Sequence, residues 1–270
     1  MTTNKMKKFA VVVSGWHFPL HFYEEIAKQH IPDGWQMDLF CISHRDPSLV
    51  VEEKKQYIAS LGRTFREKLD KILYKKVASI ADLEKLGWKY IEEPNTIGDW
   101  GNTNQWLEKN DYKQYEFLLI SHDDNFILTR ELFSSIILQK DYDEWLIYAN
   151  TIGMPRGNLR GSFEFFKREM LDIMGGKFDL SLVTLTREGK TDNPDDINAL
   201  YDWNNGPYPL TQLIHEKGLV NKVYALSPTY RVSAFCIEGE RGYISKTHGI
   251  NTEVENHGIK VLKKNNLINV

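Results

Sequence analysis

Residues 115–125 read YEFLLISHDDN, a short apolar run followed at once by the polar side chains HDDN. The apolar run has the character of a buried strand, and the polar residues begin where that strand ends. In open α/β sheets, ligands bind outside the carboxyl ends of the strands. We therefore expect an α/β fold in which His122, Asp123, Asp124 and Asn125 lie at a ligand site.

The N-terminal region predicts a strand, a helix and a second strand. Residues 9–14 (FAVVVS) form a β-branched apolar run that ends at a loop, residues 15–19, and HFYEEIAKQH (21–30) follows as a helix. A turn at residues 32–34 leads to the strand WQMDLFCIS (35–43). The three elements fit into about 35 residues, the length of a βαβ unit, so we expect parallel strands here.

The middle of the chain predicts more helix than strand. Residues 50–87 are charged, lack proline and space their apolar residues in a helical manner, which favours two helices, one ending near Gly62. WKYIE (88–92) reads as a strand. Residues 94–104 (PNTIGDWGNTN) read as a glycine and asparagine loop, and QWLEKND (105–111) as a helix.

The second half predicts a mixture of elements. We expect strands at DEWLIYAN (143–150), NKVYALSP (221–228) and YRVSAFCIEG (230–239), and helices at FEFFKREMLDIMGG (163–176) and LTQLIHEKG (210–218). The turn-rich segment between the helices is the expected mobile loop. No repeat or long linker divides the chain, which predicts a single domain.

Composition narrows the possible functions. The 270 residues are 41% hydrophobic and 26% charged, as in a folded globular protein. A net charge of −3 argues against a nucleic-acid-binding protein, which needs clustered basic residues. Cys41 and Cys236 lie in apolar runs without metal-like spacing, which fits a reducing cytoplasm but leaves a disulfide open. We see no signal peptide and no apolar run of transmembrane length, and expect a cytoplasmic protein.

Three segments together resemble the GT-A glycosyltransferases, in particular those like family 2. Residues 95–124 resemble the part of that family that ends in its D-x-D motif, RGSFEFFKREMLDIMGGKFD (160–179) resembles a later segment that ends in G-x-F-D, and FAVVVSGWHFP (9–19) resembles its first strand and loop. The resemblance implies a Rossmann-like mixed sheet flanked by helices in one domain. It also implies a nucleotide-binding half, residues 1–125, and an acceptor-binding half, residues 126–270.

The activity that this resemblance implies is the transfer of a sugar from a UDP- or GDP-sugar to a glycan or another hydroxyl acceptor. In the family the first strand meets the base, the loop and helix before the D-x-D motif approach the nucleotide, and the acidic set contacts ribose and metal. The residues implied as nucleotide ligands are Ser14, Gly15, Asp46, Asp99, Gly101, Asn102 and Asp123.

A divalent cation, Mn²⁺ or Mg²⁺, is the expected cofactor because it neutralises a departing diphosphate through hard oxygen ligands. His122 stands where the first Asp of D-x-D lies, so the resemblance supports Asp124 as the metal ligand. His248 matches a late histidine that reaches the metal or the diphosphate in many members of the family. The alternatives without a role in ligand binding are that Asp123 and Asp124 cap a helix beginning in NFILTRELF, and that His248 is structural.

An inverting enzyme needs a general base near the acceptor hydroxyl. By its position after the acidic cluster in the family, Asp202 is the candidate, with Asp195 and Asp196 behind it; the alternative is that all three are ordinary acids of a surface loop. We expect the segment 191–209 around them to close over the donor. A nucleotidyltransferase and a sugar-binding module without activity remain as alternative functions, and the sequence leaves the oligomeric state open.

Overall fold

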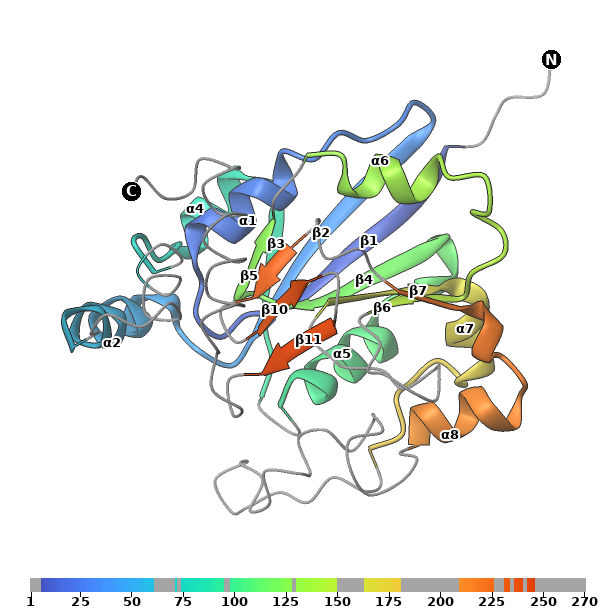
Figure 1. Ribbon diagram of the computed structural model, residues 1–270. Coiled ribbons are helices and arrows are strands. Elements are labelled where there is room, and N and C mark those ends of the chain that lie inside the picture. Colours follow the sequence, from blue (N-terminus) through green and yellow to red (C-terminus); the bar gives the residue numbers. More distant parts are fainter. Residues whose placement is uncertain are drawn as a thin grey trace.

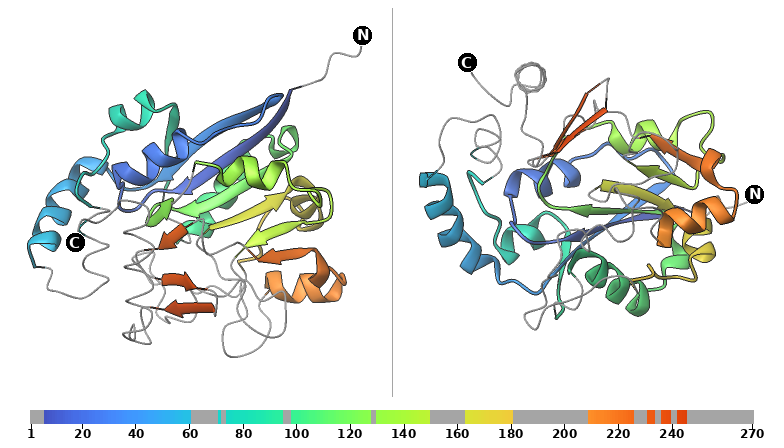
Figure 2. Two further views of the ribbon diagram at one scale, coloured as in Figure 1. Left: turned by 45° about the horizontal axis from the view of Figure 1, so that its top comes forward. Right: turned by 60° about the horizontal axis from the view of Figure 1, so that its bottom comes forward.

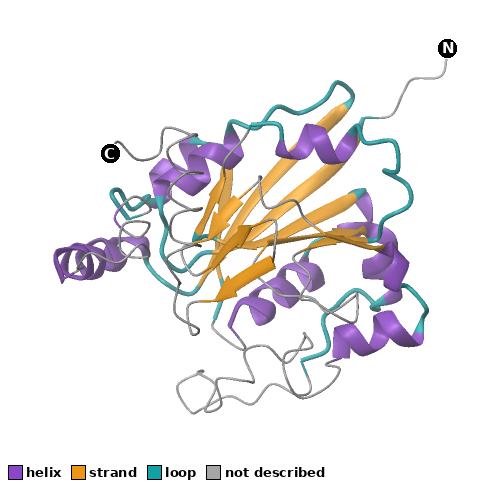
Figure 3. Ribbon diagram, in the orientation of Figure 1, coloured by secondary structure: helices purple, strands orange, loops and turns teal. Residues whose placement is uncertain are grey.

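The structure is a computed structural model that describes residues 6–60, 71, 74–94, 98–127, 130–149, 163–180, 209–225, 231–233, 236–239 and 242–245. Its centre is a seven-stranded sheet with the strand order β3-β2-β1-β4-β7-β6-β8 (Figure 1). Helices cover both faces of this sheet (Figure 3). The α/β class expected from the sequence, with a mixed sheet flanked by helices, is confirmed.

One half of the sheet is parallel. It contains β1 (Lys7–Ser14), β2 (Trp35–Ser43), β3 (Trp88–Glu92) and β4 (Phe117–His122). β1 pairs in parallel with both β2 and β4, and β2 pairs in parallel with β3. The prediction of a parallel sheet at the N-terminus is therefore confirmed.

The other half makes the sheet mixed. β7 (Phe163–Lys167) runs antiparallel to β4, and β6 (Ile147–Ala149) runs antiparallel to β7. β8 (Val223–Ala225) pairs in parallel with β6. Two small antiparallel sheets join β5 (Asn125–Ile127) to β9 (Arg231–Ser233), and β10 (Cys236–Gly239) to β11 (Gly242–Ser245).

The helices divide between the two faces of the sheet (Figures 1 and 2). α1 (Leu20–Ala27) and α6 (Leu132–Ile137) pack on one face, whereas α5 (Gly98–Lys109), α7 (Arg168–Ile173) and α8 (Pro209–Glu216) pack on the other. The remaining helical elements are α2 (Pro47–Ser60), α4 (Ile80–Lys85), η1 (Tyr112–Gln114) and η3 (Val220–Lys222).

Alternation along the central strands builds a core on each face. In β1, Phe9, Val11 and Val13 belong to the apolar cluster beneath α1 and α6, whereas Ala10 and Val12 belong to the cluster beneath α5. A strand buried on both faces reads as a continuous apolar run, which is the reason FAVVV lacks polar residues. β1 and β4 run parallel and end at the register partners Ser14 and His122, so the polar residues that follow lie at one edge of the sheet.

Three element predictions differ from the structure. Residues 98–104 are not a loop, because α5 begins at Gly98 and buries Trp100, Trp106 and Leu107 against the sheet. Residues 163–167 are not helical but form β7, in which Phe163 and Phe165 face one core and Phe166 faces the other. The helix predicted there is shorter and begins at Arg168. The predicted strand at 230–239 contains two separate strands, β9 and β10.

None of the helices in the described part of the chain is both long enough and apolar enough to cross a bilayer.

Candidate functional site

The candidate site lies at the carboxyl ends of β1 and β4. The chain leaves β1 toward β2 on one side, while β4 lies on the other side of β1, so the strand order reverses between these neighbours. Such a switch point opens a crevice at the sheet edge where ligands bind in open α/β folds. Ser14 and His122 are register partners at this point. The structure thus confirms that the HDDN residues follow a buried strand.

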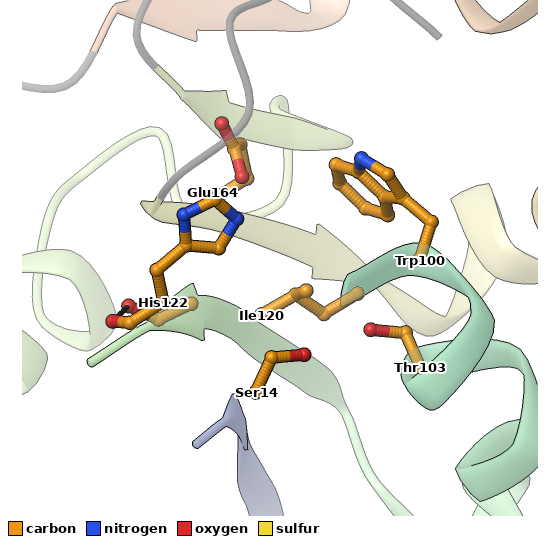
Figure 4. Close-up of a pocket in the computed structure, with 7 residues that line it drawn as sticks. Ser14, Trp100, Thr103, Ile120, His122 and Glu164 are labelled. Carbon is orange, nitrogen blue, oxygen red and sulfur yellow. Dashed lines mark hydrogen bonds between the residues drawn. The ribbon is translucent and has the colours of Figure 1, made fainter. Parts of the chain in front are cut away.

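Successive residues at the end of β4 serve different faces, because side chains alternate along a strand. His122 and Ile120 line a small pocket, partly open to solvent, on the face covered by α5 (Figure 4). Asp123 instead reaches the loop that follows β1. The full lining of the pocket is Ser14, Trp100, Thr103, Ile120, Ser121, His122 and Glu164.

Glu164 is a pocket residue that the sequence reasoning missed. It lies on β7 opposite Ile120, and only 1% of its surface is exposed. Figure 4 shows its carboxylate and the His122 ring on the same side of the pocket, with Trp100 and Thr103 of α5 across from them. The available signal was a single acid within the apolar run FEFF, because buried carboxylates are rare unless they have a partner or a role.

Asp123 holds the loop after β1. Its Oδ2 accepts hydrogen bonds from the backbone N–H groups of Trp16 (2.9 Å), His17 (2.9 Å) and Phe18 (2.7 Å), and from the Tyr23 hydroxyl (3.2 Å). Burial raises the pKa of the Asp123 carboxyl, and these hydrogen bonds act in the opposite direction. We predicted a ribose contact for this residue. In the structure its carboxylate is 1% exposed and turned into the protein.

The Tyr23 hydroxyl connects this carboxylate to β2. It lies 3.3 Å from the Cys41 sulfur and is fully buried, and burial raises the pKa of both the phenol and the thiol. Both groups are therefore neutral at physiological pH. Cys41 is a free cysteine.

Asp124 and Asn125 continue from the strand without entering a helix. Asp124 is 2% exposed, and Asn125, which is fully buried, donates to the carbonyl of His122 at 3.1 Å. Asn125 begins β5, and the next helix, α6, starts only at Leu132 with Glu131 as its N-cap residue. The alternative that these acids cap a helix in NFILTRELF is therefore wrong.

An aromatic and cationic pair, Trp16 and Arg45, stands beside the crevice, and we call it the Trp16–Arg45 platform. The guanidinium carbon lies 4.5 Å from the centre of the Trp16 ring, and Arg45 Nη1 donates to the Trp16 carbonyl at 2.8 Å. Arg45 also pairs with Glu53 of α2. Trp16 is 41% exposed as a residue. In the sequence, the sign of this pair was the tryptophan in the loop SGWHFP.

Gly15 lets this loop lie close to β2. A Cβ atom there would lie 2.8 Å from both the Cys41 sulfur and the Phe18 ring, which is too close for any side chain. The Ser43 hydroxyl donates to the Gly15 carbonyl at 2.6 Å and accepts from the Arg45 N–H at 2.9 Å. β2 thereby holds both members of the platform.

The other predicted nucleotide ligands lie near the starts of two helices, α2 and α5. Asp46 accepts from the Ser48 N–H at 2.8 Å at the start of α2, and this hydrogen bond lowers the pKa of its exposed carboxyl. Asp99, Gly101 and Asn102 lie in the first turns of α5 rather than in a loop, and Asn102 is 4% exposed. Their neighbours Trp100 and Thr103 line the pocket.

Four predicted residues lie outside the described residues: Asp195, Asp196, Asp202 and His248. The segment predicted to close over the donor, 191–209, has its first described residue at Pro209. Within the described ranges, no group of three or more His, Cys, Asp or Glu side chains is placed to hold a metal ion.

No protein-family profile matches this chain, and no characterised protein matches it in sequence. In its fold the chain is similar to solved GT-A-type glycosyltransferases. One is a mannosyltransferase from Pyrobaculum calidifontis in complex with GDP-Man and Mn²⁺, with 13% identity, a TM-score of 0.46, and coverage of 88% of this chain and 58% of that one. Another is Drosophila β1,4-galactosyltransferase 7, solved with xylobiose, with 11% identity, a TM-score of 0.41, and coverage of 81% and 64%.

A third similar structure is 4-diphosphocytidyl-2C-methyl-D-erythritol synthase from Anaerococcus prevotii, with 10% identity, a TM-score of 0.41, and coverage of 95% of this chain and 96% of that one. The chain spans about three fifths of the length of the two glycosyltransferase chains, 58% and 64%. At these identities and TM-scores the similarity extends to the arrangement of helices and strands and no further.

Proposed function

We propose that this chain is a glycosyltransferase that binds a nucleotide sugar at the carboxyl ends of β1 and β4 and transfers the sugar to a hydroxyl acceptor. The observation that carries the proposal is the Trp16–Arg45 platform, a partly exposed tryptophan held at a switch-point crevice by the buried carboxylate of Asp123. An aromatic face binds a nucleobase by stacking, and sites of this kind lie at such crevices.

The loop after β1 favours glycosyl transfer over nucleotidyl transfer. In folds that bind phosphate at this loop, its free backbone N–H groups hold the anion. Here the N–H groups of Trp16, His17 and Phe18 already donate to Asp123. The loop also lacks Lys and Arg. It is therefore suited to meet the base end of a nucleotide rather than its phosphates.

The base and ribose would lie along β1 and β2. In this arrangement the Trp16 ring stacks on the base, and the backbone of Ser14 and Gly15 borders it. Asp46, exposed just before α2, would accept a hydrogen bond from a hydroxyl of the ribose. Trp100 and Thr103, from α5, bound the neighbouring pocket, where Glu164 and His122 offer polar contacts to a sugar. Residues 1–125 thus supply the nucleotide half, and residues 126–270 the acceptor half.

For the expected cation, Mn²⁺ or Mg²⁺, we propose a site near the end of β4. Asp124 supplies a hard oxygen ligand there and, with His248, would hold the ion. Such a cation neutralises negative charge on a departing diphosphate. Asp202 would accept the proton of the acceptor hydroxyl as a general base.

Calorimetric titration tests the proposal with UDP and with GDP, each with and without manganese, on the wild type and on Trp16→Ala. We expect one nucleotide to bind and Trp16→Ala to weaken it about tenfold, since stacking on one aromatic ring contributes about 1–3 kcal/mol. Leu138→Ala is the matched control, because Leu138 is also exposed, at 70%, but lies at the C-cap of α6. A sugar-binding module without activity would ignore both nucleotides.

Hydrolysis of sugar nucleotides without acceptor provides the second readout. We expect the wild type to release the nucleoside diphosphate slowly from one donor, because water replaces the missing acceptor. If neither nucleotide binds and no donor is hydrolysed, the proposed function is wrong.

A further inference from the structure

The Asp123 carboxylate joins two segments far apart in the sequence. It leaves the end of β4 and accepts the N–H groups of Trp16, His17 and Phe18, which precede it by 105–107 residues. Three backbone N–H groups of one loop thus share a single carboxyl group as acceptor, which ties the loop to the end of β4. Phe18 adopts a φ of 51°, in the left-handed region that residues other than glycine rarely adopt. The loop is thus held in a conformation that it would not adopt alone.

This loop determines where the Trp16 indole stands. The N–H of Trp16 donates to Asp123 and its carbonyl accepts from Arg45, so both sides of its backbone are fixed. Arg45 in turn donates its own N–H to Ser43, at the end of β2. Trp16 is held at its place by contacts to its backbone, while the residue as a whole stays 41% exposed. Binding to a preformed surface avoids the entropy cost of ordering that surface.

We infer that Asp123 is the positioning residue of the Trp16–Arg45 platform, and that it acts on the bound base through the loop without touching the nucleotide or the metal. This inference rests on the proposed function for the identity of the ligand. The geometry of the loop itself does not depend on that function. Asp123 and Asp124, adjacent in the sequence, therefore have separate roles: one orders the base platform and the other serves the diphosphate end.

Three variants test the inference. Asp123→Ala removes the acceptor of the loop N–H groups. Asp123→Asn keeps a carbonyl oxygen for the position of Oδ2, the atom that accepts every close bond, and removes the charge. Tyr23→Phe is the matched control, because it removes a hydrogen bond to the same Oδ2 atom and leaves the loop N–H groups in place. Circular dichroism and thermal unfolding establish that each variant is folded.

Hydrogen exchange of the amides of Trp16, His17 and Phe18 reports the loop directly and needs no ligand. In Asp123→Ala we expect these amides to exchange at least about tenfold faster, with an intermediate rate in Asp123→Asn and the wild-type rate in Tyr23→Phe. Titration with the nucleoside diphosphate that binds the wild type, without metal, should give the same order. Affinity falls about tenfold in Asp123→Ala, and by less than about threefold in Tyr23→Phe.

Wild-type exchange rates or wild-type nucleotide affinity in folded Asp123→Ala would overturn the inference. If Asp123→Ala does not fold, Asp123→Asn decides: equal losses in Asp123→Asn and Tyr23→Phe would mean that the carboxylate acts only on overall stability. A wild type that binds no nucleotide contradicts the proposed function instead, while the exchange rates still decide whether Asp123 holds the loop.

Discussion

Gly15 lies at a point of the site that has no room for a side chain. An alanine Cβ would lie 2.8 Å from the Cys41 sulfur and from the Phe18 ring, both of which are buried. We expect Gly15→Ala to lower the free energy of unfolding by about 1–3 kcal/mol, the usual cost of overpacking a core. Urea unfolding measures this loss.

The double variant Gly15→Ala, Cys41→Ala provides the control for that prediction. Removing the sulfur relieves one of the two close contacts, so the second substitution should restore part of the stability, with a coupling energy of about 0.5–3 kcal/mol. Additive effects of the two substitutions would contradict the steric explanation.

Asp124 carries the prediction about metal. Asp124→Asn keeps the size of a side chain that is 2% exposed but weakens a hard oxygen ligand. We expect the manganese-dependent part of nucleotide binding to disappear, while binding without metal stays within about twofold of the wild type. Titration with and without manganese measures this difference. Asp46→Asn is the control, and an equal loss of the manganese effect in both variants would remove Asp124 from the metal site.

Sequence reasoning located the acidic pair but could not assign different roles to its two residues. It placed Asp123 and Asp124 at a strand end, which the structure confirms, and it assigned both to the ligand. The groups that donate hydrogen bonds to Asp123 are backbone N–H groups of a loop more than 100 residues earlier in the sequence. For Phe18 the separation is 105 residues. A backbone N–H has no signature in a sequence, so this contact was beyond prediction.

At the scale of elements, the short helix α4 has an N-terminal cap whose contribution to stability should depend on pH. Ser79 and Asp82 form a capping box in which the Ser79 N–H and hydroxyl donate to Asp82, and these bonds lower the pKa of the Asp82 carboxyl. A carboxyl whose pKa is lowered by folding stabilises the protein above its unfolded pKa of about 3.9 and loses that contribution as the pH falls through its folded value.

We therefore expect Asp82→Asn to lower the free energy of unfolding at pH 7 by at most about 1 kcal/mol, since the cap is solvent-exposed. The difference from the wild type should shrink in acid, below the ordinary pKa of Asp, because both proteins then lack the charge. Urea unfolding at neutral and acidic pH measures it. Glu84→Gln, on the same helix outside the cap, should show no such dependence; a matching dependence there would contradict the cap.

The elements that were predicted well are those that a single pattern determines. β2 and β3 have the bounds expected from the apolar runs at 35–43 and 88–92. α5 was missed at its start because glycine and asparagine disfavour helix, and the burial of Trp100 and Trp106 outweighs that preference. β7 was mistaken for a helix because FEFFK continues into REMLDI. Its strand state comes from pairing with β4, which lies far from it in the sequence.

At the scale of the whole molecule, the site lies at the carboxyl end of β1, the strand between β2 and β4. The platform is attached to β1 and β2, and the acidic pair is attached to β4. A ligand that bridges them therefore contacts segments that come together only in the folded chain. Its binding free energy adds to the free energy of unfolding, because the unfolded chain offers no such site.

Cys41 reports that linkage. Its thiol is fully buried beneath the platform, and burial raises its pKa, so it should react with a thiol reagent only when the protein opens. In Cys236→Ser, Cys41 is the only thiol left of the two in the chain. We expect the bound nucleoside diphosphate, at about 100 times its dissociation constant, to slow the labelling of Cys41 about a hundredfold, which corresponds to about 2.7 kcal/mol. Adding Trp16→Ala should reduce this protection at the same ligand concentration. Labelling that the nucleotide leaves unchanged would mean that the nucleotide does not bind across the ends of β1, β2 and β4.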